Sequence, residues 1–382
     1  MQGPGSIEIT GLCRRDVSRF PIKHPHQLSH GRVNLPRVKR KHIGLVVVAI
    51  VLLVAVATPA LLMGPQVYSA AWHAYVVGPR HRPLRDVKFE RTEERRKRGE
   101  YLADGALGCF RCHSDRDWNT PGAPAVAGKA GTGHVFTEDG RPWLVAPNLT
   151  SDVETGTGRW TDDMIARAIR EGVGHDGRTL HPQMWYGAFH DLSDEDVASV
   201  VVYLRSLPPV RNALPQTHIP FGRRINYADL PQPIIAPVPE PDLSTEVKRG
   251  EYLVDVADCA GCHTSWYHPE APLFTKLFGG GNAIDGPNGT TIVSPNITSD
   301  ASGISYYDEN LFIAAMRTGH VKARTLNAVM PWAWYGNLTD DDLKAVFTYL
   351  RTQAPVKHVV DNTEPPTYCK LCQERHGGGD RN

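Results

Sequence analysis

The sequence CFRCH at 109–113 recurs as CAGCH at 259–263, and the rest of the chain is organised around these two stretches. Two thiols separated by two residues can bond to both vinyl groups of one haem, and a histidine that follows at once can ligate its iron. The sequence therefore predicts two covalently bound haem c groups. The predicted attachment and axial residues are Cys109, Cys112 and His113 for one haem, and Cys259, Cys262 and His263 for the other.

Other uses of a Cys-x-x-Cys pair fit these stretches less well. A zinc site built from two such pairs would have them about 12 to 20 residues apart. These pairs lie at 109–112 and 259–262, and each is followed by histidine. A thioredoxin-like redox pair would lie among alternating strands and helices, and no such pattern surrounds either stretch.

Charge and hydropathy predict a membrane anchor. The 382-residue chain has a formal net charge of +1, so there is no basic excess for nucleic acid. Residues 43–63 are uncharged and long enough to cross a bilayer as one helix, which Pro59 should bend near its end. Arg and Lys residues cluster at 32–41, so we expect the preceding side in the cytoplasm and the haem motifs in the periplasm.

The same segment could instead be a signal peptide cleaved near 68–71. Its apolar core is longer than that of most signal peptides, which favours a retained anchor. The expected location is thus the inner membrane, with a single span and periplasmic haem domains. Cysteine usage agrees, because six of the seven cysteines would lie on the oxidising side.

An internal repeat extends well beyond the haem motifs. KRGEYL at 97–102 and 248–253, PNLTSD at 147–152 with PNITSD at 295–300, and LSDED at 192–196 with LTDDD at 338–342 occur in the same order. A tandem duplication accounts for this pattern. The expected segments are a cytoplasmic tail 1–42, anchor 43–63, connector 64–92, first haem domain 93–210, Pro-rich linker 211–243, second haem domain 244–357 and C-terminal tail 358–382.

Each copy is predicted to be all-α. A short helix should precede each haem motif, a second should start at Thr161, and a third at Ser193 or Thr339. Asp196 and Asp342 follow the last two caps by three residues, in an arrangement that resembles a capping box. The segments between helices are rich in Gly, Pro, Asn and Asp, so strand content should be low.

The sixth ligand of each iron decides between electron transfer and substrate chemistry. The repeat provides a test, because equivalent haems should use equivalent residues. Met184 and Met330 occupy matching positions, eight residues before the third helix, whereas no distal histidine recurs in register. Each methionine could simply fill the core. Their position in irregular chain favours axial ligation, and thioether ligation favours ferrous iron.

With these motifs in hand, the chain resembles bacterial membrane-associated cytochromes c, and in particular the cytochrome c subunits of membrane-bound alcohol and gluconate dehydrogenases. The resemblance covers roughly residues 93–356. It implies tandem class I cytochrome c domains, and it implies contacts with the haem edge from four residues, namely Asn148, Trp160, Asn296 and Tyr307. Those subunits usually carry three haems and often have their anchor at the other end of the chain, whereas this chain has two complete motifs.

The C-terminal tail contains a third Cys-x-x-Cys pair, Cys369 and Cys372, with Gln373 where a haem motif would have histidine. A third haem is therefore not expected. A disulfide is the default in an oxidising compartment, and a small metal site that includes His376 is the alternative, although no fourth ligand is evident.

Two functions fit the sequence. The first is electron transfer between a dehydrogenase or quinol-oxidising complex and a downstream cytochrome or oxidase, with no catalytic residue in this chain. The second is a two-haem enzyme, a peroxidase or an oxidase of a small sulfur compound, with one reactive haem. The matching methionines favour electron transfer.

Overall fold

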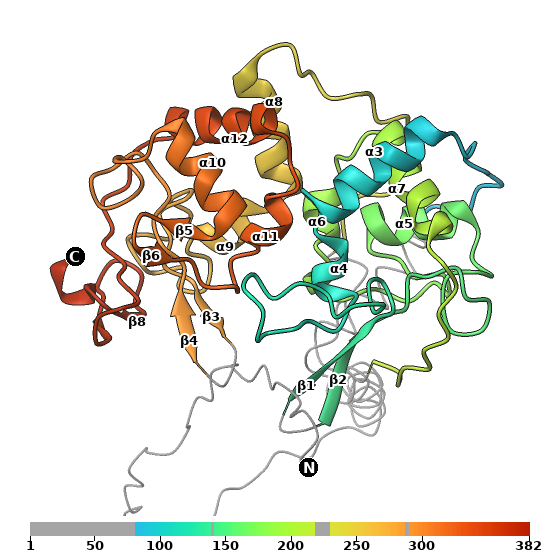
Figure 1. The fold of residues 1–382 in the computed structure, drawn as a ribbon, viewed down its shortest axis with the longest axis horizontal. Coiled ribbons are helices and arrows are strands. Elements are labelled where there is room, and N and C mark those ends of the chain that lie inside the picture. The colour runs from blue at the N-terminus through green and yellow to red at the C-terminus, as the bar shows by residue number, and fades with distance from the viewer. Residues whose placement is uncertain (1–80, 139–140, 218–229, 287–289) are drawn as a thin grey trace, which may run out of the picture. The chain divides into compact units, whose positions relative to one another are not determined.

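A computed structural model describes residues 81–138, 141–217, 230–286 and 290–382, all within one compact unit of the chain (Figure 1). The predicted tail, the anchor at 43–63 and most of the connector lie outside the described residues. Among the helices of the described part, none has the length and apolarity needed to span a bilayer.

The described chain is rich in helices, and its two copies share the same order of α-helices and of the first β-hairpin. The first copy contains α3 (Glu93–Asp104), α4 (Cys109–Cys112), β1 (His134–Glu138), β2 (Arg141–Ala146), α5 (Asp162–Glu171), η1 (Pro182–Met184), α6 (Tyr186–Phe189) and α7 (Asp194–Ser206). The second contains α8 (Glu246–Val256), α9 (Cys259–His263), β3 (Ala283–Asp285), β4 (Thr291–Val293), α10 (Glu309–Thr318), β5 (His320–Val321), β6 (Arg324–Thr325), α11 (Trp332–Tyr335) and α12 (Asp340–Thr352). The tail adds β7 (Thr367–Tyr368), β8 (Arg375–His376) and η5 (Gly379–Arg381).

The helix starts predicted from the caps are confirmed. Thr161 caps α5, Ser193 caps α7 and Thr339 caps α12, each by accepting a hydrogen bond from a backbone amide of the first turn. In the arrangement at Ser193 that resembles a capping box, the Ser193 hydroxyl accepts from the Asp196 amide, while the Asp196 side chain binds an arginine. The Asp196 carboxylate accepts hydrogen bonds from Arg98 at 2.7 and 2.9 Å. A guanidinium is the stronger donor, so it outcompetes the backbone amide of the cap.

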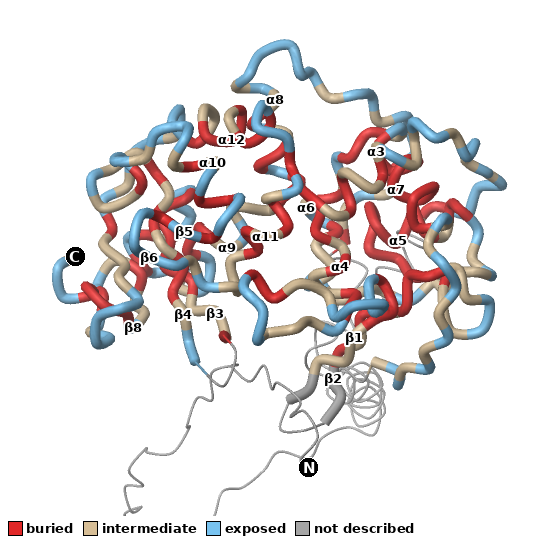
Figure 2. The backbone as a smooth tube through the Cα atoms, viewed as in Figure 1, coloured by how far each residue is buried: buried red, intermediate tan, exposed pale blue. Residues whose placement is uncertain are grey.

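The first and last helices of each copy cross at a glycine. A Cβ atom on Gly99 of α3 would lie 1.9 Å from the carbonyl oxygen of Ser199 on α7. Gly250 of α8 stands in the same relation to Ala345 of α12, again at 1.9 Å. Because no side chain intervenes, the backbones approach closely and the apolar faces of α7 and α12 enter the core, which appears as the buried segments in Figure 2.

Strands are short, as expected, and occur as four two-stranded antiparallel sheets in the described chain. The longest pairs β1 with β2 in register from His134 with Ala146, with an irregularity after Phe136. In the second copy, β3 pairs with β4 at the equivalent place. These hairpins carry the chain from each haem motif to the loop that follows it, so they position that loop beside the motif.

Candidate haem-binding sites

The two Cys-x-x-Cys pairs lie on single turns of helix. The turn α4 starts after Gly108 and α9 starts after Asp258. Both of these residues have a left-handed backbone conformation, with φ of 55° and 51°. The Asp258 carboxylate accepts the Gly261 amide at 3.1 Å, which offsets the strain of a residue with a side chain in this conformation. The turn brings both sulfurs of a pair to one short segment, with the histidine directly after it.

The two histidines are held in the same way. The Nδ1 atom of His113 lies 2.8 Å from the carbonyl oxygen of Pro147, and that of His263 lies 2.8 Å from the carbonyl oxygen of Pro295. Only a protonated Nδ1 can donate this bond, which leaves Nε2 with a free lone pair. Burial lowers the pKa of His113 to about 4 and also lowers that of His263, so both rings are neutral and can ligate a metal.

The loops that present these carbonyls depend on a buried asparagine. The amide nitrogen of Asn148 donates to the carbonyl of Val210 at 2.8 Å, and its oxygen accepts from the backbone and hydroxyl of Thr150. Asn296 makes the equivalent bonds, to Val356 at 2.5 Å and from Thr298. Both asparagines therefore shape the loop, while their predicted contact with the haem edge stays a prediction.

The two methionines occupy matching turns. The backbone amide of Met184 donates to His181 at 3.0 Å, and that of Met330 donates to Asn327 at 3.0 Å. Both side chains are half-buried and pack against the main core. The internal repeat pairs these residues in the sequence, and the backbone confirms that pairing. Iron ligation by either residue stays a prediction.

Trp160 and Tyr307 also occupy equivalent turns. Their amides donate to Thr157 and Ile304, at 2.9 and 3.0 Å. Trp160 stacks on the ring of His175, with centroids 4.2 Å apart, whereas the Tyr307 hydroxyl accepts a hydrogen bond from Arg324 at 3.3 Å. The surroundings of the two rings thus differ between the copies, and their predicted contact with the haem edge stays a prediction.

The chemistry of the site residues fits a covalently held haem. Burial raises the pKa of Cys109 and of Cys259 to about 12, so both sulfurs are uncharged in apolar surroundings that suit a thioether. His113 and His263 each offer a neutral imidazole nitrogen. The crossing helices of each copy, α3 with α7 and α8 with α12, supply an apolar wall. A haem would add a metal that can change its oxidation state.

The two copies contact one another through reciprocal hydrogen bonds. Asp196 binds Arg98 of its own copy and accepts from the Tyr252 hydroxyl of the other copy at 2.5 Å. Asp342 binds Arg249 of its own copy at 2.9 Å and accepts from the Tyr101 hydroxyl. The KRGEYL repeat therefore supplies both the intracopy arginine and the intercopy tyrosine.

Sequence reasoning missed the role of Pro147 and Pro295. The signal was present, because both prolines belong to the repeated Pro-Asn motif. The sequence pointed to the asparagines of that motif, whereas the carbonyl oxygens of the prolines orient the two imidazoles. A carbonyl group leaves no side-chain signature, so the pairing becomes visible when the loop is folded.

Comparisons with known proteins agree with a cytochrome. No protein-family model matches the chain. It is 34% identical over 174 residues to one of the subunits of nicotinate dehydrogenase from Pseudomonas putida, covering 44% of this chain and 14% of that protein. It is 30% identical to the fructose dehydrogenase cytochrome subunit of Gluconobacter japonicus, covering 67% of this chain and 52% of that subunit.

A third relative is the cytochrome c subunit of a quinone-dependent alcohol dehydrogenase from Gluconobacter oxydans, with 28% identity over 68% of this chain and 55% of that subunit. The chain thus spans about half the length of these two cytochrome subunits. The chain is accordingly a homologue of the cytochrome c subunits of bacterial alcohol, fructose and gluconate dehydrogenases.

Proposed function

We propose that this chain is a membrane-anchored periplasmic cytochrome c with two haems that transfers electrons from a dehydrogenase or quinol-oxidising complex to a downstream cytochrome or oxidase. One observation carries the proposal. In both copies a neutral, buried histidine directly follows a Cys-x-x-Cys turn and donates its Nδ1 proton to a proline carbonyl. This arrangement leaves one imidazole nitrogen available to an iron whose porphyrin the two sulfurs would hold.

The proposal assigns Met184 and Met330 as the second axial ligands. Their matching turns support this assignment, since two equivalent haems need ligands from equivalent places. A six-coordinate iron has no position for substrate, so the expected role is electron transfer. The reciprocal contacts between the copies support a single electron path, because they hold the two haem domains against each other.

Absorption spectroscopy of the full-length protein tests the ligand set. We expect low-spin iron at both haems, with the charge-transfer band that a thioether ligand gives. Met184→Ala and Met330→Ala should each remove half of this band and create one high-spin haem. Met164→Ala is the control, because Met164 lies on α5 and has no methionine at its equivalent position in the second copy. Peroxide turnover by the unaltered protein would instead favour the two-haem enzyme.

Membrane anchoring needs a separate test. The full-length chain should remain in the membrane fraction after a high-salt wash, and a variant with four Asp residues within 43–63 should not. A reporter fused after residue 92 should be active in the periplasm. Copurification from solubilised membranes should recover a dehydrogenase or quinol-oxidising complex. Release of the unaltered chain by salt alone would contradict anchoring without affecting the haem assignment.

A further inference from the structure

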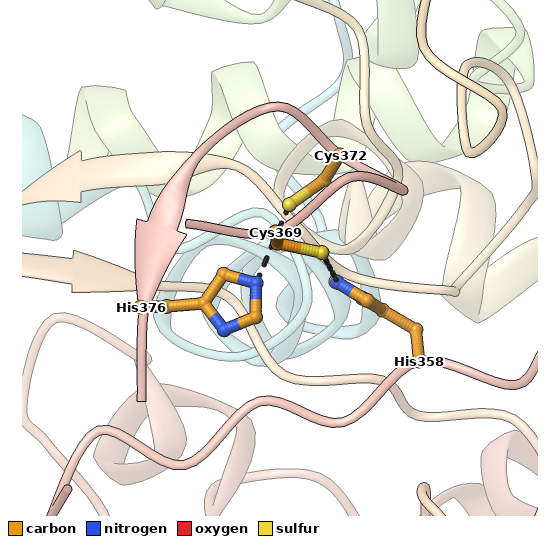
Figure 3. Close-up of side chains that lie close together, drawn as sticks. All are labelled: His358, Cys369, Cys372 and His376. Carbon is orange, nitrogen blue, oxygen red and sulfur yellow. Dashed lines mark hydrogen bonds between the residues drawn. The ribbon is translucent and has the colours of Figure 1, made fainter. Parts of the chain in front are cut away.

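We propose that His358, Cys369, Cys372 and His376 form a structural zinc site that fastens the C-terminal tail to the second haem domain. This site is independent of the proposed electron transfer, because none of its four residues belongs to a haem motif. It also resolves the alternatives for the tail, because His358 supplies the ligand that completes the set (Figure 3).

The four side chains meet at one point in the interior. Their ligand atoms all lie within 4.8 Å of one another, and every one of the four residues is buried, with at most 2% of its surface exposed. The Sγ atom of Cys369 is 3.5 Å from Nε2 of His358, and that of Cys372 is 3.4 Å from Nε2 of His376. In tetrahedral zinc with Zn–S of about 2.3 Å and Zn–N of about 2.0 Å, such a pair is about 3.5 Å apart.

Both imidazoles are oriented for metal binding. Nδ1 of His358 lies 2.8 Å from the carbonyl oxygen of Gly279, and Nδ1 of His376 lies 3.0 Å from that of Gly377. Each ring thus donates its proton to a backbone carbonyl and turns an unprotonated Nε2 toward the sulfurs. Zinc-binding histidines use their other nitrogen in this way, which fixes the tautomer and the ring plane.

The backbone around the cysteines forms a compact turn that points both sulfurs inward. The Cys369 amide donates to Glu374 and the Gln373 amide donates back to Cys369, both at 2.9 Å. The backbone of Gln373 is in the left-handed conformation, with φ of 63°, which lets the chain reverse directly after Cys372. The hairpin of β7 and β8 then returns His376 to the same side. Two sulfurs and two imidazoles in a closed site are a preferred ligand set for structural zinc.

A disulfide between Cys369 and Cys372 fits the surroundings less well. It would leave Nε2 of His358 and of His376 buried beside sulfur atoms that can neither donate a hydrogen bond nor bind strongly. Leu273, Val356 and Leu371 surround the site, so water cannot readily replace the lost contacts. A cation satisfies all four groups at once.

The first copy indicates what His358 would do without a metal. Its equivalent there is Asn212, whose side chain donates to the carbonyl of Thr132 at 2.9 Å, as His358 does to Gly279. Their backbone amides also match, since Asn212 donates to Thr155 and His358 to Ser302. Asparagine is therefore sufficient to hold the loop, and the imidazole adds an atom that reaches the cysteines.

The site lies against the loop 279–281, which is hydrogen-bonded to the second haem histidine. The amide of Gly280 donates to the carbonyl of His263 at 2.7 Å, directly after the Gly279 carbonyl that holds His358. A Cβ atom on Gly281 would lie 2.8 Å from Cβ of Cys372, so the turn that carries the cysteines packs against this loop without a gap. Zinc would therefore tie residues 358–382 to the backbone beside His263.

Metal analysis of the full-length protein, purified without added metal, tests the proposal. We expect one zinc per chain beside the haem iron. His358→Asn places the first copy's residue in the second copy, so it should keep the loop hydrogen bond and both haems but lose the zinc. Cys372→Ser should lose it as well. His268→Asn is the control, because His268 contacts Glu374 at 3.0 Å on the same tail without belonging to the four ligands.

A second readout reports the fastening of the tail. Zinc removal by a chelator should increase hydrogen–deuterium exchange at 358–382 and near Gly279, and added zinc should reverse it. Three results would overturn the proposal: a Cys369–Cys372 disulfide in peptide mass spectra of the purified protein, zinc that persists in both ligand variants, or exchange in the tail that does not respond to zinc. Copper or iron at the site would overturn the choice of metal.

Discussion

The two copies hold their candidate haem histidines by the same bond from Nδ1 to a proline carbonyl, yet flanking segments bury α5 of the first copy and leave the first turn of its equivalent α10 exposed. In the first copy, the end of the connector and the Pro-rich linker pack on α5. The linker also bonds Val145 of β2 through Thr217, as the C-terminal tail bonds Val293 of β4 through Asn362. The duplicated residues therefore define the core around each candidate haem site. The segments that cover each core are the parts of the chain that flank that copy in the sequence.

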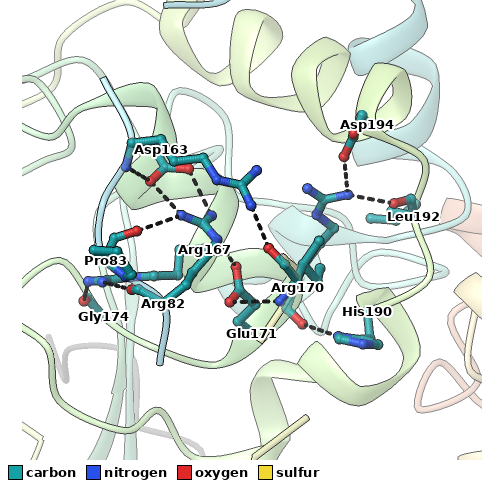
Figure 4. Close-up of polar contacts among 12 residues, drawn as sticks. Arg82, Pro83, Asp163, Arg167, Arg170, Glu171, Gly174, His190, Leu192 and Asp194 are labelled. Atoms are coloured by element: carbon teal, nitrogen blue, oxygen red, sulfur yellow. Dashed lines mark hydrogen bonds and ion pairs between the residues drawn. The ribbon is translucent and has the colours of Figure 1, made fainter. Parts of the chain in front are cut away.

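The contrast is sharpest at α5 and α10. The Arg82 guanidinium is buried between Asp163, at 2.7 and 2.8 Å, and Glu171, at 2.9 Å (Figure 4). The linker adds the amide of Ile234, which donates to Glu171 at 3.3 Å. In the equivalent helix α10 the first turn is exposed, and Glu309 forms a solvent-exposed ion pair with Lys344. A flanking arginine thus turns a solvated helix face into a buried one.

Removal of Arg82 should have the largest effect. Arg82→Met leaves Asp163 and Glu171 buried without their cation, which costs about 3–5 kcal/mol of folding free energy. Hydrogen–deuterium exchange should rise in the first copy and stay unchanged in the second. Arg178→Met is the control, because its ion pair with Asp176 is half exposed and should contribute at most about 1 kcal/mol. Equal loss of protection in both copies would show that the effect of Arg82 is not specific to the first.

The crossing glycines should give the next largest effect, and an equal one in each copy. Gly99→Ala and Gly250→Ala place a methyl group against a backbone carbonyl, so each should cost about 3 kcal/mol, the upper end for overpacking. Denaturant unfolding measures the loss, and exchange locates it. Gly187→Ala is the control, because its Cβ would meet no atom within 4 Å. A loss of stability in only one of the two variants would show that the two helix crossings are not equivalent.

The reciprocal tyrosines should have a smaller effect that both copies share. Tyr101→Phe and Tyr252→Phe each remove a hydrogen bond to a carboxylate, worth about 1.5 kcal/mol at this partly buried contact. Calorimetry should show less cooperative unfolding of the two copies in either variant. Tyr267→Phe, at an exposed ring, should leave the transition unchanged. Unaltered cooperativity in both variants would mean that these contacts do not couple the copies.

The smallest effect concerns pH, and it should again be similar in the two copies. Burial raises the pKa of Asp104 and of Asp255 to about 6, from 3.8. The folded state therefore binds these protons more tightly than the unfolded chain, and the free energy of unfolding should fall as pH rises from about 4 to about 6. Asp104→Asn and Asp255→Asn should each flatten part of this slope in denaturant titrations. An unchanged slope in both variants would assign it to other groups.

Much of the fold follows from local sequence. The caps Thr161, Ser193 and Thr339 start their helices where predicted, because capping needs one side chain and amides of the next turn. Apolar residues at helical spacing on α7 and α12 are buried, among them Val197, Val200 and Val201 on α7. Asp196 shows the limit of such reasoning. Its position resembles a capping box, but an arginine 98 residues away binds its carboxylate.

The sequence by itself determined that the chain is duplicated, which residues carry the candidate haem motifs and where the main helices begin. These features depend on neighbours within a few turns or on plain repetition, so they can be read along the chain. The tertiary structure decided which carbonyls orient His113 and His263, how Tyr101 and Tyr252 join the copies, and that His358 meets the cysteines of the tail. Each of these contacts joins residues from different segments, and folding alone brings them within hydrogen-bonding distance.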